Sequence, residues 1–368
     1  MGGIRRIYAT LLIALASCEA APAPELTEAN IILECPATRS ADPDQYKISD
    51  YNLWIFHPNG ALEERRYVSA RELSVQDGRI LHRTKILKNI PYRIYACANL
   101  GYELRLGTED ELKAYRYYMA YPDEYSTGLP MASIQDKVCI REDGEEIHLA
   151  LERLLAKVEL KIDRSALNAD VVFTVREVSV GGCPSSVTPF APSKAENKEQ
   201  IFNSGFIKTG LATDPLNKEI QVGESGSLFV YLLENLQGDL LENVLSDEGK
   251  VFRDSRYADV CSYIKIKAEY SSPDYTTKPG AYLIYRFYLG ENRNNFDVRR
   301  NTHYTITIRP EGDGLSEDSW RVDKDALEEK TRFELHPAAF NTCRSGEDFH
   351  IWCEVSPSRT PVEIEPIA

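Results

Sequence analysis

No phosphate-binding glycine loop, dinucleotide fingerprint, G-x-S-x-G nucleophile elbow or H-E-x-x-H zinc motif occurs in this chain. Its six histidines are scattered singly, and a lone histidine is more often a surface or core residue than a catalytic one. Paired carboxylates such as Glu145 and Glu146 stand where a loop is expected to meet a strand. Two catalytic carboxylates can come from anywhere in a chain, so a glycoside hydrolase stays open as an alternative. The residues nevertheless predict a protein that is not an enzyme and that holds no cofactor.

Basic residues are fewer than acidic residues in this chain. The chain has 43 Lys and Arg residues against 57 Asp and Glu residues, which gives a formal net charge of −14. Removal of Arg5 and Arg6 with an N-terminal leader lowers that charge to −16. Such an acidic surface repels phosphate backbones, so we expect no nucleic acid among its partners.

Long apolar runs are absent after the N-terminus. No stretch beyond residue 17 approaches the roughly 18 apolar residues of a membrane-spanning helix. Residues 1–17, in contrast, combine Arg5 and Arg6 with a short apolar run that is too short to cross a bilayer. This composition predicts a secretory signal peptide.

The signal peptide ends at Cys18 in an unusual way. A leucine three places before this cysteine, with Ala and Ser between, resembles the lipobox of bacterial lipoproteins. In that interpretation Cys18 becomes the acylated first residue of a tether at residues 18–26, which holds the protein on the outer membrane, facing either the periplasm or the cell surface. The alternative is a soluble secreted protein that is cut after Ala20 or Ala21.

Seven further cysteines leave an odd number in a compartment where disulfides can form. They are Cys35, Cys97, Cys139, Cys183, Cys261, Cys343 and Cys353. Cys343 and Cys353 flank a short polar stretch that two adjacent strands could bridge, which makes them the candidate disulfide. His336 and His350 lie nearby, but the spacing matches no zinc pattern, so we expect a disulfide or buried thiols and no metal.

The mature chain is rich in strand patterns. Apolar and charged residues alternate over residues 156–163 and 264–270, which predicts two half-buried strands. Segments rich in β-branched and aromatic residues occupy residues 51–56, 92–98, 171–180, 228–233, 281–289, 304–308 and 349–355. Pro58-Asn59-Gly60 supplies a turn after the first of these. Many short strands with turn signals between them predict an all-β fold of sandwiches.

One helix is expected within this β pattern. Thr108 and Glu111 form a capping box, and Leu112, Tyr115 and Met119 then share a face whose spacing indicates core packing. We expect residues 121–131 to form a long loop and residues 184–218 a surface excursion, because Pro, Ser, Asn and Gly recur there without a strict period.

Three acidic residues, Asp42, Asp44 and Asp50, could suggest a calcium loop. They lack the glycine, the spacing and the closing glutamate of such a loop, so a turn is the preferred interpretation.

Several motifs resemble, in their order along the chain, the fimbrillin-like lipoproteins of Bacteroidales, a family of fimbrial subunits and anchors. They are K-I-S-D-Y-N-L-W-I-F at residues 47–56 with Asn59-Gly60, L-L-A-K-V at 154–158, L-E-N-L-Q-G at 233–238, Y-L-G at 288–290 and N-F-D-V-R-R-N-T-H-Y at 295–304. The match covers roughly residues 31–308. On elementary grounds Arg300-Asn301-Thr302 is a turn before a strand, and Glu234-Asn235 ends one.

The resemblance implies two tandem transthyretin-like Greek-key β-sandwiches, at residues 27–152 and 153–310. It also implies assembly by strand donation, in which a neighbouring subunit's strand fills an open groove. In stalk subunits of the family an arginine-directed protease removes the first strand, whereas anchors keep it.

Residues 29–34 form a short apolar run suited to that first strand, and Arg39 followed by Ser40 matches the family's cleavage position. The alternative is an arginine in an ordinary loop. Cleavage there would also remove Cys35 and leave an even number of cysteines.

The chain departs from the family pattern at its C-terminus. A charged linker follows residue 309, and residues 333–367 suffice for two or three strands, so residues 311–368 are expected to form a linker and a partial Ig-like β segment. We therefore expect a fimbrial anchor, tip or accessory subunit whose partners are other fimbrial subunits and outer-membrane lipid. The alternative function is a glycan-binding surface lipoprotein of a polysaccharide-uptake system, since 21 tyrosines and three tryptophans could supply aromatic platforms.

Overall fold

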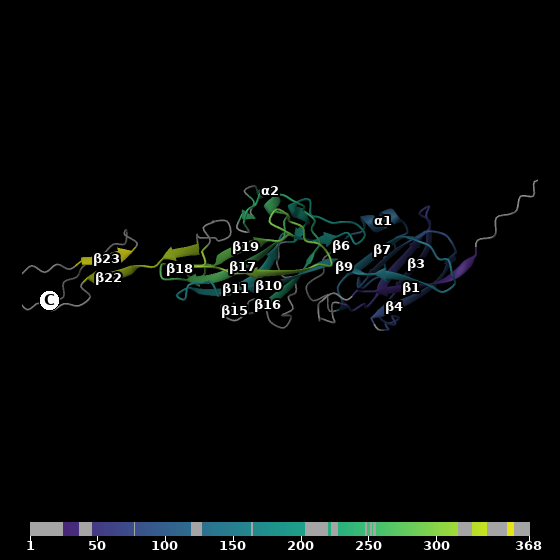
Figure 1. Ribbon diagram of the computed structural model, residues 1–368, viewed down its shortest axis with the longest axis horizontal. Coiled ribbons are helices and arrows are strands. Elements are labelled where there is room, and N and C mark those ends of the chain that lie inside the picture. Colours follow the sequence, from purple (N-terminus) through teal and green to yellow (C-terminus); the bar gives the residue numbers. More distant parts are fainter. Residues whose placement is uncertain are drawn as a thin grey trace, which may run out of the picture.

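The computed structural model describes residues 25–36, 46–76, 78–118, 127–162, 165–202, 220–221, 227–246, 249–250, 252, 255–315, 326–336 and 352–356. Two groups of sheets follow one another along the long axis of the molecule, with the first group at the right of Figure 1 and a C-terminal hairpin at the left. The fold is all-β, as predicted. Within the described part of the chain, no helix has the length and apolar character needed to cross a membrane.

The first group is a sandwich of two sheets. One sheet has the order β4-β1-β8, and the other has the order β3-β2-β5-β7-β9. Their strands are β1 (Leu26–Glu34), β2 (Tyr51–Phe56), β3 (Leu62–Val68), β4 (Arg79–Leu87), β5 (Tyr92–Ala98), β7 (Met131–Val138), β8 (Glu145–Ala150) and β9 (Glu152–Arg153). Apolar side chains from both sheets form one buried core between them.

Strand β2 is buried along its whole length. Leu53 and Ile55 point into the sandwich core, while Trp54 and Phe56 on the opposite face join a second apolar cluster outside the sandwich. Successive side chains of a strand point to opposite faces, so an uninterrupted apolar run fits a strand that is covered on both sides. Gly60 closes the predicted turn after β2, with a φ of 84° and an amide that donates to the carbonyl of His57.

The second group repeats this architecture. A sheet of order β16-β10-β20 packs against a sheet of order β15-β11-β17-β18-β21, in which β19 also pairs with β17. Their strands are β10 (Leu155–Ile162), β11 (Val172–Gly181), β15 (Ile220–Gln221), β16 (Ser227–Leu233), β17 (Tyr263–Ser271), β18 (Tyr275–Thr277), β19 (Leu283–Tyr288), β20 (His303–Ile308) and β21 (Leu327–Glu329). Every second residue of β17 is buried in the core, which confirms the alternation predicted for residues 264–270.

The remaining elements are short. They are β6 (Tyr117–Tyr118), β12 (Cys183–Pro184), β13 (Ser186–Val187), β14 (Ile201–Phe202), the 3-10 helix Lys198–Gln200, α1 (Glu109–Ala114), α2 (Ser255–Ala258), β22 (Arg332–His336) and β23 (Trp352–Ser356).

The two sandwiches share a topology that their strand order makes visible. Strand β1 pairs antiparallel with β4 and parallel with β8. Strand β10 pairs antiparallel with β16 and parallel with β20. The first strand of each sandwich therefore lies in the middle of its smaller sheet, between two strands that come later in the chain.

Helix α1 begins at the predicted capping box. The amide of Glu111 donates to Oγ1 of Thr108 at 3.2 Å, and the amide of Thr108 donates to Oε2 of Glu111 at 3.1 Å. Leu112 is fully buried, as predicted, whereas Tyr115 already has extended backbone and Met119 lies outside the described residues. The helix thus ends after Ala114.

We expect Thr108→Ala to destabilise the protein by about 1 kcal/mol, because the substitution leaves a helix N-terminal amide without its side-chain acceptor. Urea denaturation measures this loss. The control is Ser69→Ala, which also removes a hydroxyl that is hydrogen-bonded to a glutamate three residues later but caps no helix. Equal effects of Thr108→Ala and Ser69→Ala would contradict the capping role.

Part of the predicted linker after the second sandwich forms a strand that pairs with that sandwich. Strand β21 pairs antiparallel with β18, and the amide of Lys330 donates to the carbonyl of Asp274 at 2.7 Å. Strands β22 and β23 then form a two-stranded sheet, five residue pairs long. Leu327–Glu329 were expected in the linker and instead add an edge strand to the larger sheet of the second sandwich.

Candidate assembly site

The candidate assembly site is the place of β1 in the smaller sheet of the first sandwich. Nine residue pairs join β1 to β4, and six join it to β8. Ala29, Ile31 and Leu33 are fully buried and belong to the sandwich core. The predicted apolar first strand is therefore a central strand, and its side chains fill the space between β4 and β8.

Side chains at the β8 side add hydrogen bonds to the strand ladder. Oδ1 of Asp143 accepts from the hydroxyl of Thr27 at 3.0 Å and from the amide of Glu28 at 2.9 Å. These bonds, first of all the one from the Glu28 amide, lower the pKa of Asp143 because they favour its ionised form. Nδ2 of Asn30 donates to the carbonyl of Gly144 at 2.9 Å. The loop before β8 thus holds the polar residues of β1 by hydrogen bonds.

Ion pairs at the two ends of β1 are exposed. Lys88 lies 2.9 Å from Glu25, and Arg79 lies 2.8 Å from Glu34. Exposed ion pairs contribute little to stability. Backbone pairing and the buried apolar side chains therefore account for most of the attachment of β1.

Most predicted site residues fall outside the described part of the chain. Cys18, Arg39, Ser40 and Cys343 belong to this group. Cys353 lies exposed on β23, and because Cys343 is outside the described residues, a disulfide between the two stays a prediction.

Cys35 directly follows β1 and is half-buried. Burial raises the pKa of its thiol, and the Arg153 guanidinium, with Nη1 3.9 Å from Sγ, partly offsets this effect. The chain between Cys35 and β2 contains Arg39, so a cut at Arg39 would leave β1 attached only by non-covalent contacts.

Asp50, one of the three residues weighed for calcium, has a different role. Its carboxylate accepts from the amides of Leu100 at 3.2 Å and Gly101 at 3.0 Å. Burial raises its pKa. Asp42 and Asp44 lie outside the described residues. In the part of the chain that the structure describes, no group of three or more His, Cys, Asp or Glu side chains is placed to hold a metal.

Residues 182–193, here called the strap, follow β11 of the second sandwich and pack against the first sandwich. Strand β13 of the strap pairs with β6, and Val187 and Phe190 are buried against the outer face of the first sandwich. The Phe190 ring meets Trp54 and Tyr95 edge-on, with centroids 6.1 and 5.3 Å apart. The prediction of a surface excursion is wrong for this segment, because its sparse apolar residues fill a contact between domains.

A buried ion pair holds the strap from the side of the second sandwich. Nη2 of Arg300 lies 2.5 Å from Oε2 of Glu234, and the two side chains are 14% and 6% exposed. The same guanidinium donates to the carbonyls of Thr188, Pro189 and Ala191 at 2.8–2.9 Å. Oε2 of Glu234 also accepts from the amide of Ser193 at 3.0 Å.

Asn235, the neighbour of Glu234, is fully buried and joins three segments. Its amide group donates to the carbonyl of Val260 at 2.8 Å, and its Oδ1 accepts from the amide of Ala195 at 3.1 Å. Sequence reasoning placed Glu234-Asn235 after a strand and Arg300-Asn301 in a turn, and both placements are correct. It missed the pairing of Glu234 with Arg300, which are 66 residues apart in the chain.

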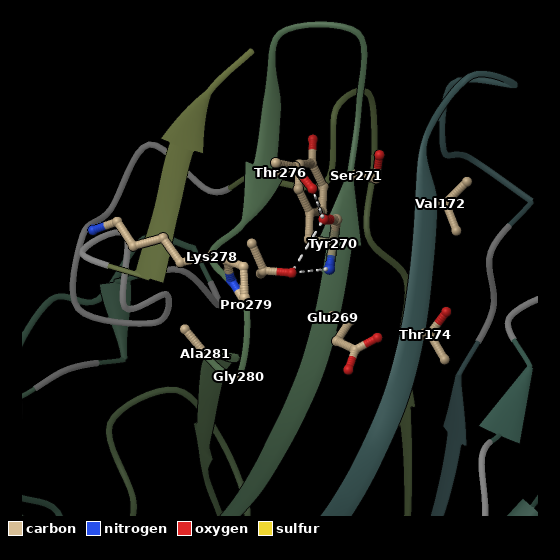
Figure 2. Close-up of a pocket in the computed structure, with 11 residues that line it drawn as sticks. Val172, Thr174, Glu269, Tyr270, Ser271, Thr276, Lys278, Pro279, Gly280 and Ala281 are labelled. Atoms are coloured by element: carbon tan, nitrogen blue, oxygen red, sulfur yellow. Dashed lines mark hydrogen bonds between the residues drawn. The ribbon is translucent and has the colours of Figure 1, made fainter.

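A hollow of about 350 Å³ opens on the larger sheet of the second sandwich (Figure 2). It lies where residues 278–282 separate β18 from β19, two strands that both pair with β17. The Thr277 hydroxyl takes the place of a strand partner there, because it accepts from the amide of Tyr270 at 3.3 Å. Thr174 and Glu269 line the hollow from β11 and β17.

The comparisons with known proteins agree with this architecture. A family described as a domain of unknown function (DUF4906) matches residues 230–308, which run from β16 to the end of β20 and include Glu234, Asn235 and Arg300. None of the curated proteins matches the chain.

Several solved structures resemble the chain in fold. A candidate cell adhesion protein from Parabacteroides distasonis ATCC 8503 has 14% sequence identity and a TM-score of 0.53, with 82% of this chain and 97% of that chain covered. Another from the same organism has 15% identity and a TM-score of 0.51, with coverages of 89% and 96%. The tip fimbrial protein Mfa3 from Porphyromonas gingivalis, with a C-terminal truncation, has 11% identity, coverages of 83% and 98%, and a TM-score of 0.48 that is too low to support an argument.

The two structures from Parabacteroides distasonis, both with TM-scores above 0.5, are described as adhesion proteins, and the likeness extends over most of both chains. The chain therefore shares the all-β fold of these proteins, and the all-β class that its strand pattern predicted is confirmed.

Proposed function

We propose that this protein is a surface lipoprotein of a fimbrial system, in which it acts as an anchor, tip or accessory subunit and assembles by exchange of β-strands. The observation that carries the proposal is the position of β1. It is a central strand, it comes first in the described chain, and its buried side chains are those that a donated strand would have to replace.

The fold supports the same proposal. Solved structures that share it are described as cell adhesion proteins. Anchoring of the mature chain to outer-membrane lipid through Cys18 belongs to the proposal and rests on the lipobox-like sequence alone.

Two mature forms distinguish the possible roles. An acylated Cys18 with an intact β1 makes the protein a fixed anchor or tip subunit. A start at Ser40 makes it a polymerising subunit, because cleavage after Arg39 leaves the place of β1 free for a neighbour's strand.

The test is the N-terminus of the mature protein from outer-membrane preparations, determined by intact mass and terminal peptide identification. We expect either the acylated Cys18 or Ser40, together with other fimbrial subunits in a complex that resists mild denaturation. If the mature chain starts at the acylated Cys18, we expect a Cys18→Ala variant to leave the membrane fraction, whereas Cys353→Ala, which also removes a cysteine, should stay there. An unlipidated start after Ala20 or Ala21, with no associated subunits, would overturn the proposal.

A further inference from the structure

The outer face of the larger sheet in the second sandwich carries a strip of cations on an otherwise acidic chain. The strip consists of Lys265 and Lys267 of β17, Arg176 of β11 and Arg286 of β19. The burial of β17 alternates, with Ile264 and Ile266 in the core, so its lysines point away from the core. This local excess of positive charge contrasts with the net charge of −14 for the whole chain.

Two of these cations lie directly opposite each other. Lys265 pairs in register with Arg286 on one side and with Ser179 on the other. Like charges in directly opposed positions destabilise a sheet. Among the described residues, neither cation takes part in an ion pair within 4.0 Å. An anionic group placed between the two cations would attract both and offset their mutual repulsion.

The carboxylates of the same face are already engaged. Glu177 accepts from Nζ of Lys267 at 2.8 Å, and Glu269 accepts from Nη2 of Arg176 at 2.7 Å. Glu177 also attracts Lys265, which contributes to the lowered pKa of Glu177. The four cations of the strip still exceed these two carboxylates by two, so the face keeps a net positive charge.

An aromatic ring closes one end of the strip. A Cβ at Gly181 would lie 2.2 Å from Cζ of Tyr263, so the Tyr263 ring crosses the backbone of β11 at that glycine. The guanidinium of Arg286 lies 5.7 Å from the centroid of the same ring. Aromatic rings beside cations provide both an apolar and a charged contact, which suits a ligand with apolar and anionic parts.

The hollow of Figure 2 lies at the other end of the strip. Thr174, Ser271 and Thr276 bring hydroxyl groups to its wall. Nζ of Lys330 donates to Oγ of Ser271 at 2.8 Å and adds a further cation at this end. A volume of about 350 Å³ is enough for one sugar ring with its hydroxyl groups.

We propose that this face binds a linear acidic polysaccharide. A carboxylate or sulfate of the polymer lies between Lys265 and Arg286, and one sugar residue occupies the hollow near Thr174 and Thr276. The hydroxyl-lined hollow favours a sugar over an acidic peptide, because hydroxyls both donate to and accept from sugar hydroxyls. This proposal is independent of strand exchange, which concerns the first sandwich.

The experiment measures binding of the full purified chain to alginate oligomers, with neutral dextran as a comparison, at low and at physiological salt. We expect binding to alginate that weakens with salt, and no binding to dextran. Lys265→Glu with Arg286→Glu should weaken alginate binding at least tenfold. A matched control, Arg83→Glu with Lys137→Glu, makes the same charge change at exposed strand positions of the first sandwich and should stay within twofold.

A second variant tests the hollow without a change of charge. Thr174→Trp fills it and should weaken alginate binding at least threefold, while the thermal unfolding transition stays in place. Equal losses in both charge variants would show attraction by charge alone and overturn the proposal. Unchanged binding by Thr174→Trp, or binding of poly-glutamate as tight as that of alginate, would also overturn it.

Discussion

A chain that begins at Ser40 is expected to lose the independent stability of its first sandwich. The cut removes the fully buried side chains of Ala29, Ile31 and Leu33 from the core between β4 and β8. Burial of one Leu or Ile side chain contributes about 1.5–3 kcal/mol. Two such side chains, with the strand ladder, approach the total stability of about 5–15 kcal/mol that is typical of a domain.

The decisive measurement adds β1 back as a separate peptide. A peptide of the sequence Leu26–Glu34 should bind to the truncated chain and restore its cooperative urea transition. The same peptide with Ile31→Asp should fail, because a carboxylate would enter the core without a partner. The control peptide carries Glu28→Gln at an exposed position and should restore the transition as well as the original.

An unchanged urea transition would contradict this role of β1. If the chain from Ser40 unfolds at the same urea concentration as the chain with β1, the strand is not an essential part of the core. Its place could then not serve as a high-affinity acceptor for another subunit's strand.

Breaking the ion pair between Glu234 and Arg300 should cause a large loss of stability in the second sandwich. Arg300→Ala leaves Glu234 as a buried carboxylate and removes the donor to three strap carbonyls. Removal of one partner from a buried ion pair typically destabilises a protein by about 3–5 kcal/mol. Urea denaturation followed by tryptophan fluorescence should report this loss, since Trp54 contacts Phe190 of the strap.

The neighbouring arginine provides the control. Arg299 pairs with Glu291 and Asp297, and its side chain is 48% exposed. Arg299→Ala should cost at most about 1 kcal/mol, because exposed ion pairs contribute little. Similar effects of Arg299→Ala and Arg300→Ala would contradict the role that we assign to Arg300.

A double-mutant cycle separates the pair from the strap. Glu234→Ala with Arg300→Ala should destabilise the protein by less than the sum of the two single variants, because neither charge is then left buried alone. Additive losses would instead mean that each residue acts only through its own contacts with the strap backbone.

The strands with a regular pattern could be predicted from the sequence because their two faces meet different surroundings. In β17, lysines and a glutamate alternate with Ile264 and Ile266, and the structure places the apolar set in the core. The capping box before α1 is equally local, because Thr108 and Glu111 contact each other within one turn. Such features depend on residues that are close in the chain.

Residues 182–193 show where sequence patterns fail. Val187 and Phe190 stand among Pro, Ser and Thr without a period, so nothing local indicates their burial. Their partners, Trp54 and Tyr95, belong to a different sandwich. Only the folded arrangement supplies the surface that buries them.

The sequence by itself determined the all-β class, the positions of most strands, the cap of α1 and the apolar character of β1, because each follows from residues within a few positions of one another. Tertiary structure alone decided that β1 is a central strand between β4 and β8. It also brought Glu234 to Arg300 and placed Lys265 opposite Arg286. These relations depend on which strands become neighbours, and that choice is made by the burial of whole sheet faces rather than by any local pattern.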